Sequence, residues 1–154
     1  ASRGLDLSES RVLDAFAGSG AMGFELLSRG ALYAAFVDKD RKTCDRIKRT
    51  AKSLGVSTSE MSVICGDTAH LAESSQLFGG PFDVVFLDPP YAVEAEVVSK
   101  LLKDLTQAGS LTEDAVVVYE HSHKSDSVSL DNFELSKSKR YGIAQVDLLV
   151  RCEG

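Results

Sequence analysis

The order of residues in this 154-residue chain predicts an α/β fold, in which a mostly parallel seven-stranded sheet ends in an antiparallel hairpin. Three observations lead to this prediction. Short, nearly continuous apolar runs recur along the chain, as in strands that are buried on both faces. Segments with apolar residues on one helical stripe lie between them. The last two apolar runs are joined by a short polar stretch containing a glycine, which is typical of a hairpin.

The first half of the chain contains three strand–helix units. Gly30 and Gly55 follow the first two helical segments, where glycine commonly ends a helix. Gly79, Gly80 and Pro81 break the chain after the third unit. Strands are predicted over residues 11–16, 31–37 and 61–65, and helices over 21–28, 39–54 and 68–78.

The second half begins with the clearest strand, residues 82–87, followed by a helix over 94–108 and a strand over 115–120. Residues 133–135 and 143–150 are the two predicted hairpin strands. Lys137, Lys139, Arg140 and Tyr141 are expected in the turn between them. Because there is no internal repeat or low-complexity linker, we expect residues 1–154 to form a single domain.

Composition and charge exclude several classes of protein. Hydrophobic residues make up 44% and charged residues 26% of the chain, and no apolar run approaches the roughly 20 residues that span a membrane. With no secretion leader, the chain is expected to be cytoplasmic and to have no membrane partner. The three scattered cysteines form no CxxC pair, so we expect no metal site. The net charge of −6 argues against a broad nucleic-acid-binding surface.

Acidic residues and glycines lie where the predicted parallel strands end. Ligands of open α/β sheets bind at that edge. The residues concerned are Asp14, Gly18, Gly20, Asp38, Asp67 and Asp88. The glycine-rich segment 14–20 suits either a dinucleotide or S-adenosylmethionine (SAM), because glycines allow a close approach of the backbone to a ligand. Asp14 favours SAM, since a carboxylate repels a pyrophosphate and attracts a sulfonium and an ammonium group.

Two further carboxylates have alternative roles. Asp38 can accept hydrogen bonds from both hydroxyls of a ribose, or it can cap the following helix, and Asp40 can share either role. Asp67 can accept from the amino group of an adenine or cap the next helix.

Asp88, Pro89, Pro90 and Tyr91 form the sharpest motif. The two prolines stiffen the turn after a buried strand and have no N–H groups, so the Asp88 carboxylate and the Pro89 carbonyl can face a site as acceptors. Two acceptors suit the exocyclic amine of a nucleobase, whose lone pair is delocalised, because they stabilise the positive charge that develops when it attacks a methyl sulfonium. Tyr91 can stack on an unstacked base.

The motif 88–91, the segments 12–20 and 25–31 and the stretch 137–142 together resemble the RsmD-like family of bacterial methyltransferases. The resemblance implies a Rossmann-like class I SAM-dependent methyltransferase fold and methylation of guanine-N2 in 16S ribosomal RNA. Asp14, Gly18 and Gly20 would line the methionine side of SAM, Asp38 would hold its ribose and Asp67 its adenine. Phe16, Lys39, Thr68 and Asp88 are also expected in the cofactor site. Asp88, Pro89, Pro90 and Tyr91 would form the catalytic site.

The expected partner is ribosomal RNA or the small ribosomal subunit, and the chain is expected to be a monomer. The family usually has several tens of residues before the first strand, including a basic segment, and this chain is expected to lack them. Three alternatives stay open: adenine-N6 methylation of DNA, a nicotinamide-dependent oxidoreductase, and a SAM-binding or RNA-binding module that is inactive without that segment. His121 and His123 are expected to face the surface or RNA, and the predicted hairpin turn is a candidate RNA contact.

Overall fold

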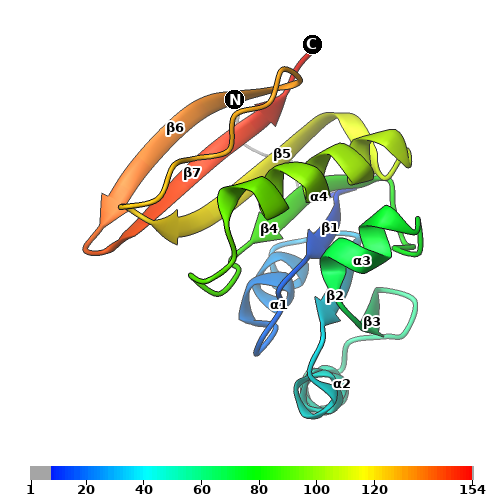
Figure 1. Ribbon diagram of the computed structural model, residues 1–154. Coiled ribbons are helices and arrows are strands. Elements are labelled where there is room, and N and C mark those ends of the chain that lie inside the picture. The colour runs from blue at the N-terminus through cyan, green and yellow to red at the C-terminus, as the bar shows by residue number, and fades with distance from the viewer. Residues whose placement is uncertain (1–7, 154) are drawn as a thin grey trace.

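A computed structural model describes residues 8–153 and contains one mixed sheet with helices on both sides (Figure 1). The strand order is β3-β2-β1-β4-β5-β7-β6. The strands are β1 (Arg11–Asp14), β2 (Tyr33–Asp38), β3 (Met61–Cys65), β4 (Phe82–Leu87), β5 (Leu111–Ser122), β6 (Phe133–Tyr141) and β7 (Ala144–Arg151). The helices are α1 (Ala21–Ser28), α2 (Arg41–Leu54), α3 (Thr68–Glu73) and α4 (Ala95–Gln107).

The first five strands are parallel, and the last two add antiparallel pairs. Strand β1 lies between β2 and β4, and β5 pairs in parallel with β4. Strand β7 then pairs antiparallel with both β5 and β6. The chain order therefore reverses at β1 and β4, and ligands of open α/β sheets bind at such a switch point. The predicted α/β class and the C-terminal antiparallel pair are confirmed.

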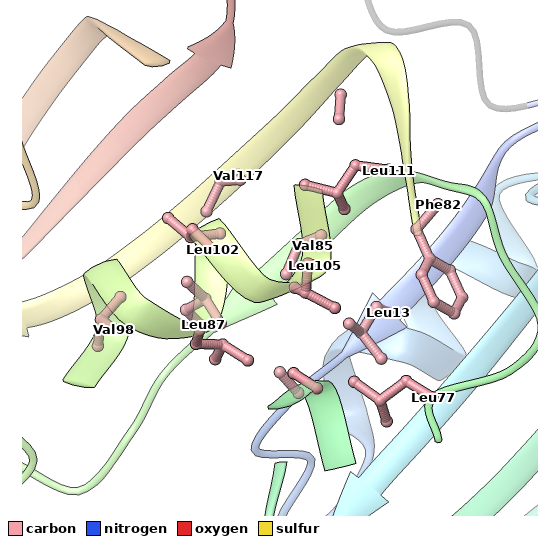
Figure 2. Packing of buried hydrophobic residues seen from close by; sticks show 14 of the residues in the cluster. Leu13, Leu77, Phe82, Val85, Leu87, Val98, Leu102, Leu105, Leu111 and Val117 are labelled. Atoms are coloured by element: carbon pink, nitrogen blue, oxygen red, sulfur yellow. The ribbon is translucent and has the colours of Figure 1, made fainter. Parts of the chain in front are cut away.

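Two apolar clusters fill the two sides of the sheet. Neighbouring strand residues point to opposite faces, so Leu13 packs in one cluster and Val12 in the other. The larger cluster lies between the sheet and the helices α3 and α4, and Figure 2 shows Leu102 and Leu105 of α4 among the strand residues. The smaller cluster packs α1 and α2 against β2, around the buried Phe36 and Ile47.

The C-terminal strands have one covered and one open face. In β5, Tyr119 and His121 are buried, while the alternate residues Val118 and Glu120 are only partly buried. In β7 the same alternation leaves Val146 partly exposed. A strand with this pattern has one face in the core and the other towards solvent. We call this second side of β5, β7 and β6 the open face.

Several predicted boundaries differ from the structure. Helix α3 ends at Glu73, because Ser75 adopts a left-handed φ of 57° and breaks the predicted helix 68–78. Strand β6 extends to Tyr141, so the placement of Lys137, Lys139, Arg140 and Tyr141 in the hairpin turn was wrong. The turn consists of Gly142, with φ 62°, and Ile143. An exposed edge strand needs few apolar residues, which is why its polar sequence was mistaken for a turn.

His121 is buried, so the prediction that it faces the surface or RNA was wrong. It is 4% exposed and its Nε2 lies 2.6 Å from Oδ2 of Asp147, which is fully buried. Its Nδ1 lies 2.9 Å from the carbonyl oxygen of Ser122. Burial by itself would raise the pKa of Asp147. Hydrogen bonds from side chains that include Ser138, His121 and Gln145 outweigh this effect and hold the pKa below its usual value. Both ring nitrogens of His121 therefore have hydrogen-bond partners inside the fold, which holds the ring in one orientation.

No helix within residues 8–153 has the length and apolar character needed to cross a membrane.

Candidate active site

A cavity of about 570 Å³ opens at the carboxyl ends of the parallel strands, within the range of small-molecule sites. Its wall brings together most of the residues that the sequence singled out. These are Phe16, Gly18, Asp38, Lys39, Asp67, Thr68, Asp88, Pro89, Pro90 and Tyr91. They come from the ends of four strands and are separated by up to 75 positions in the chain, so the topology rather than the local sequence assembles the cavity.

The glycine-rich segment after β1 uses its N–H groups internally. Gly18 N donates to Asp38 Oδ2 at 3.0 Å, and Gly20 N donates to the carbonyl oxygen of Ala17 at 2.8 Å. Gly23 N, in the first turn of α1, donates to Asp14 Oδ2 at 3.2 Å. A pyrophosphate site presents free N–H groups to the anion. This segment offers few of them, which disfavours the dinucleotide alternative.

Gly18, Gly20 and Gly23 each need the absence of a side chain, but for different structural reasons. Gly18 has φ 55° and open space around its Cα, as expected where a ligand approaches the backbone. Gly20 has φ 80° and does not line the cavity; a Cβ there would lie 3.0 Å from the ring of Phe24. A Cβ at Gly23 would overlap the ring of Phe36. Gly20 and Gly23 therefore serve the turn and the packing of α1 on the sheet.

Asp14 ends β1 and is 4% exposed. Burial raises its pKa from 3.8 to about 7, with smaller contributions from the charges of Asp88 and Asp38, while the hydrogen bond from Gly23 opposes this rise. A buried carboxylate is costly unless a positive group pairs with it. The site therefore favours a cationic ligand group near Asp14.

Asp38 and Asp67 differ in the hydrogen bonds that their carboxylates accept from the local backbone. Asp38 accepts from Gly18 N and Asp40 N, and it is Asp40 that caps α2 by accepting from Thr43 N. Asp67 caps α3, where its Oδ1 accepts from Ala69 N at 3.0 Å. Its Oδ2 makes no hydrogen bond to the residues that the structure describes, so one oxygen stays available on a side chain that lines the cavity.

Thr68 ties the third strand–helix junction to the first. Its side chain is 3% exposed and its hydroxyl donates to the carbonyl oxygen of Ala15. This bond joins residues 53 positions apart, at the point where α3 begins and β1 ends. Thr68 thus fixes the spacing of the cavity wall as well as lining it.

The turn 88–91 leaves its acceptors unused. Within residues 8–153, neither the Asp88 carboxylate nor the Pro89 carbonyl accepts a hydrogen bond, and Val93 N closes the turn on the carbonyl oxygen of Pro90 at 2.9 Å. Partial desolvation raises the pKa of Asp88 although much of the residue is exposed. The Tyr91 side chain is 52% exposed beside them. Free acceptors next to an exposed ring suit a planar ligand with an N–H donor.

A second cavity of about 260 Å³ adjoins the first, since Phe16 and Asp88 line both. Its wall includes Asp14, the start of α1 and three residues of the C-terminal strands: Val118, Glu120 and Val146. Sequence reasoning missed Glu120. The signal was present in its alternation with the buried Tyr119 and His121, which places Glu120 on the opposite face of β5.

Comparisons with known proteins agree with this architecture. Ribosomal RNA small subunit methyltransferase D from Haemophilus influenzae is 31% identical over 143 residues, which cover 92% of this chain and 72% of that protein. The same-named protein of Buchnera aphidicola (from Acyrthosiphon pisum) is 29% identical, over 86% of this chain and 66% of that protein. The solved structure of a candidate methylase from Haemophilus influenzae superimposes with a TM-score of 0.85 at 30% identity, covering 96% of this chain and 89% of that one.

These likenesses confirm the Rossmann-like class I methyltransferase fold and the resemblance to RsmD-like proteins. The family model described as "Conserved hypothetical protein 95" matches residues 3–150. The chain therefore belongs to that family, the RsmD-like family.

Proposed function

We propose that this chain is a SAM-dependent methyltransferase that methylates the exocyclic amine of a nucleobase, namely guanine-N2 in 16S ribosomal RNA. The observation that carries the proposal is the pair of unused acceptors, the Asp88 carboxylate and the Pro89 carbonyl, on a stiff turn beside the cavity. An amine presents two N–H groups, and two fixed acceptors match them.

The two cavities fit SAM in the chemistry of their polar groups. Asp38 lines the first cavity and would accept from the two ribose hydroxyls, and Oδ2 of Asp67 is free to accept from the adenine amino group. Asp14 lines the second cavity and would pair with the ammonium group of the methionine portion. When bound, SAM supplies an electrophilic methyl group on a sulfonium. Asp14, Asp38 and Asp67 would then hold the cofactor on either side of Asp88.

The residues of the turn would make the amine reactive. Hydrogen bonds to Asp88 and Pro89 draw the nitrogen towards tetrahedral geometry and stabilise the positive charge that develops on it. Tyr91 would stack on the base after the base leaves its neighbours in the RNA. No strong general base is needed, because an alkylated ammonium nitrogen is far more acidic than the amine and its proton passes to water or to a carboxylate such as Asp88.

Two observations favour RNA of the small subunit as the substrate. Several relatives bear the name ribosomal RNA small subunit methyltransferase D. Lys137 and Lys139 occupy alternate positions of β6, on the same face of the sheet as Glu120, so cationic groups lie on the side where the second cavity opens. Phosphate contacts need such groups, and the whole-chain charge of −6 conceals them.

The test compares substrates and cofactors directly. The purified chain is incubated with methyl-labelled SAM and either small ribosomal subunits from cells lacking the gene or duplex DNA, and the labelled nucleoside is identified by mass spectrometry. We expect N2-methylguanosine from the subunits and no N6-methyladenine from DNA. Calorimetric titration should give binding of SAM and none of NAD. Methylation of DNA adenine, or tight binding of NAD without SAM, would overturn the proposal.

A further inference from the structure

We propose that Glu120 selects guanine by accepting a hydrogen bond from the ring N–H beside the reacting amine. This inference rests on the proposed function and adds to it a residue that distinguishes one base from another.

The strand register places Glu120 next to the catalytic turn. Strands β4 and β5 are parallel with Leu87 opposite Tyr119, and Asp88 follows Leu87 directly at the end of β4 while Glu120 follows Tyr119 in β5. Neighbouring strands lie roughly 4.8 Å apart, and paired positions point to the same face. Both residues line the second cavity. A base whose amine reaches Asp88 therefore has Glu120 at its adjacent edge.

The Glu120 carboxylate is an acceptor without a donor. The structure gives it no hydrogen bond and no ion pair with any residue between 8 and 153, although the residue is partly buried. Burial raises the pKa of Glu120, and the charge of Asp88 raises it further. A partly buried carboxylate with no partner stabilises a ligand that brings an N–H to it and disfavours one that brings a lone pair.

Among the base amines, only that of guanine has an N–H beside it. The N2 amine of guanine adjoins N1–H, which is a donor. The N6 amine of adenine adjoins N1 and the N4 amine of cytosine adjoins N3, and both of these ring nitrogens are acceptors. With Asp88 and Pro89 holding the amine in each case, a carboxylate at position 120 attracts guanine and repels the other two bases. The turn 88–91 alone does not make this distinction.

The surrounding face is consistent with a nucleotide in this position. Glu120, Val146 and Lys139 form one row across β5, β7 and β6 because each is paired in register with the next. The row runs from the cavity to the sheet edge, with the carboxylate at the cavity and the ammonium group at the edge. A base at Glu120 then has cationic charge available for the phosphates that flank it.

The experiment uses base analogues to isolate the ring N–H. Once mass spectrometry has mapped the methylated guanine, an RNA fragment is made with guanine or 2-aminopurine at that position. The 2-aminopurine base keeps the C2 amine but has an acceptor at N1. Wild-type chain, Glu120→Gln and the control Glu113→Gln are compared; Glu113 is an exposed residue of the same strand. The constants measured are kcat/KM for each RNA and Kd for SAM.

We expect wild-type chain and Glu113→Gln to favour guanine over 2-aminopurine by roughly 10- to 100-fold, the size of one charge-assisted hydrogen bond. Glu120→Gln should lose that preference, because an amide offers both a donor and an acceptor, while Kd for SAM stays within about twofold. An unchanged preference in Glu120→Gln would overturn the inference and leave the proposed function standing. A parallel rise of Kd for SAM would also overturn it, since Glu120 would then hold the cofactor. Wild-type chain that methylates no guanine would refute the proposed function itself.

Discussion

The first four strands of the sheet, β3-β2-β1-β4, which we call the covered part, and the C-terminal part, β5-β7-β6, differ in how many faces helices cover. Helices pack on both faces of the first part, so its strands are mostly apolar, and Asp14 and Asp38 stand where two of these strands end. The second part has an open face, and residues in mid-strand such as Glu120 reach a cavity from it. The covered part supplies fixed positions for a cofactor, and the open part supplies side chains that can meet a large substrate.

The largest effect expected is on turnover, at the boundary between the two parts. Asp88→Ala removes one of the two acceptors for the amine, and we expect kcat to fall by roughly 10³-fold or more. SAM binding should change little, because Asp38 and Asp67 remain. Methyl transfer and calorimetric binding are measured on the same preparation, with Asp126→Ala, an exposed residue outside the catalytic turn, as control. An equal loss of binding and turnover would assign Asp88 to the cofactor alone.

The next effect concerns the stability of the C-terminal part. Asp147→Ala leaves Nε2 of the buried His121 without its hydrogen-bond partner, and a buried polar group left unpaired costs about 1–3 kcal/mol. Urea unfolding should show this loss, whereas His123→Ala, at a partly exposed position, should cost less than about 1 kcal/mol. Similar losses in both variants would mean that the buried pair contributes no more than a surface histidine.

The buried carboxyl group of Asp14, in the covered part, should make the stability of the folded chain depend on pH. Its pKa is about 7 in the folded chain and 3.8 when unperturbed, so the folded chain holds this proton more tightly. The stabilisation that protonated Asp14 contributes to the folded chain is fully present below about pH 4. It is lost as the pH rises towards about 7. Asp14→Asn keeps an acceptor for Gly23 N and should raise the free energy of unfolding by on the order of 4 kcal/mol near pH 8, with little change near pH 4. The same gain at both pH values would show that ionisation is not the cause.

The smallest effect expected is on RNA affinity at the open face. The double substitution Lys137→Gln and Lys139→Gln should weaken RNA binding by about threefold to tenfold at low salt and make the salt dependence shallower by about 1.5 in slope. The matched control changes Lys48 and Lys52, two exposed lysines of α2 in the covered part. If the control weakens binding as much, the RNA contact is spread over the molecule and the open face has no special role.

The two parts also differed in how well the sequence predicted them. In the covered part, continuous apolar runs and the glycine at position 55 marked the elements, and β3, β4 and α1 match their predicted bounds. In the C-terminal part, the polar edge strand β6 was mistaken for a turn, and His121 for a surface residue. The buried His121 is hydrogen-bonded to Asp147, which lies 26 positions away in the sequence. Only the register of β5 and β7 brings the two residues together. Strand ends were predictable from local sequence, whereas contacts across the antiparallel strands were not.

The position of β6 at the edge of the sheet also bears on solubility. Within residues 8–153 no strand pairs with its outer side, so backbone N–H and C=O groups there are open to a strand of a second copy. Lysines on such an edge oppose this pairing, because two identical strands would bring like charges together. We therefore expect Lys137 and Lys139 to oppose self-association at this edge even when no RNA is bound.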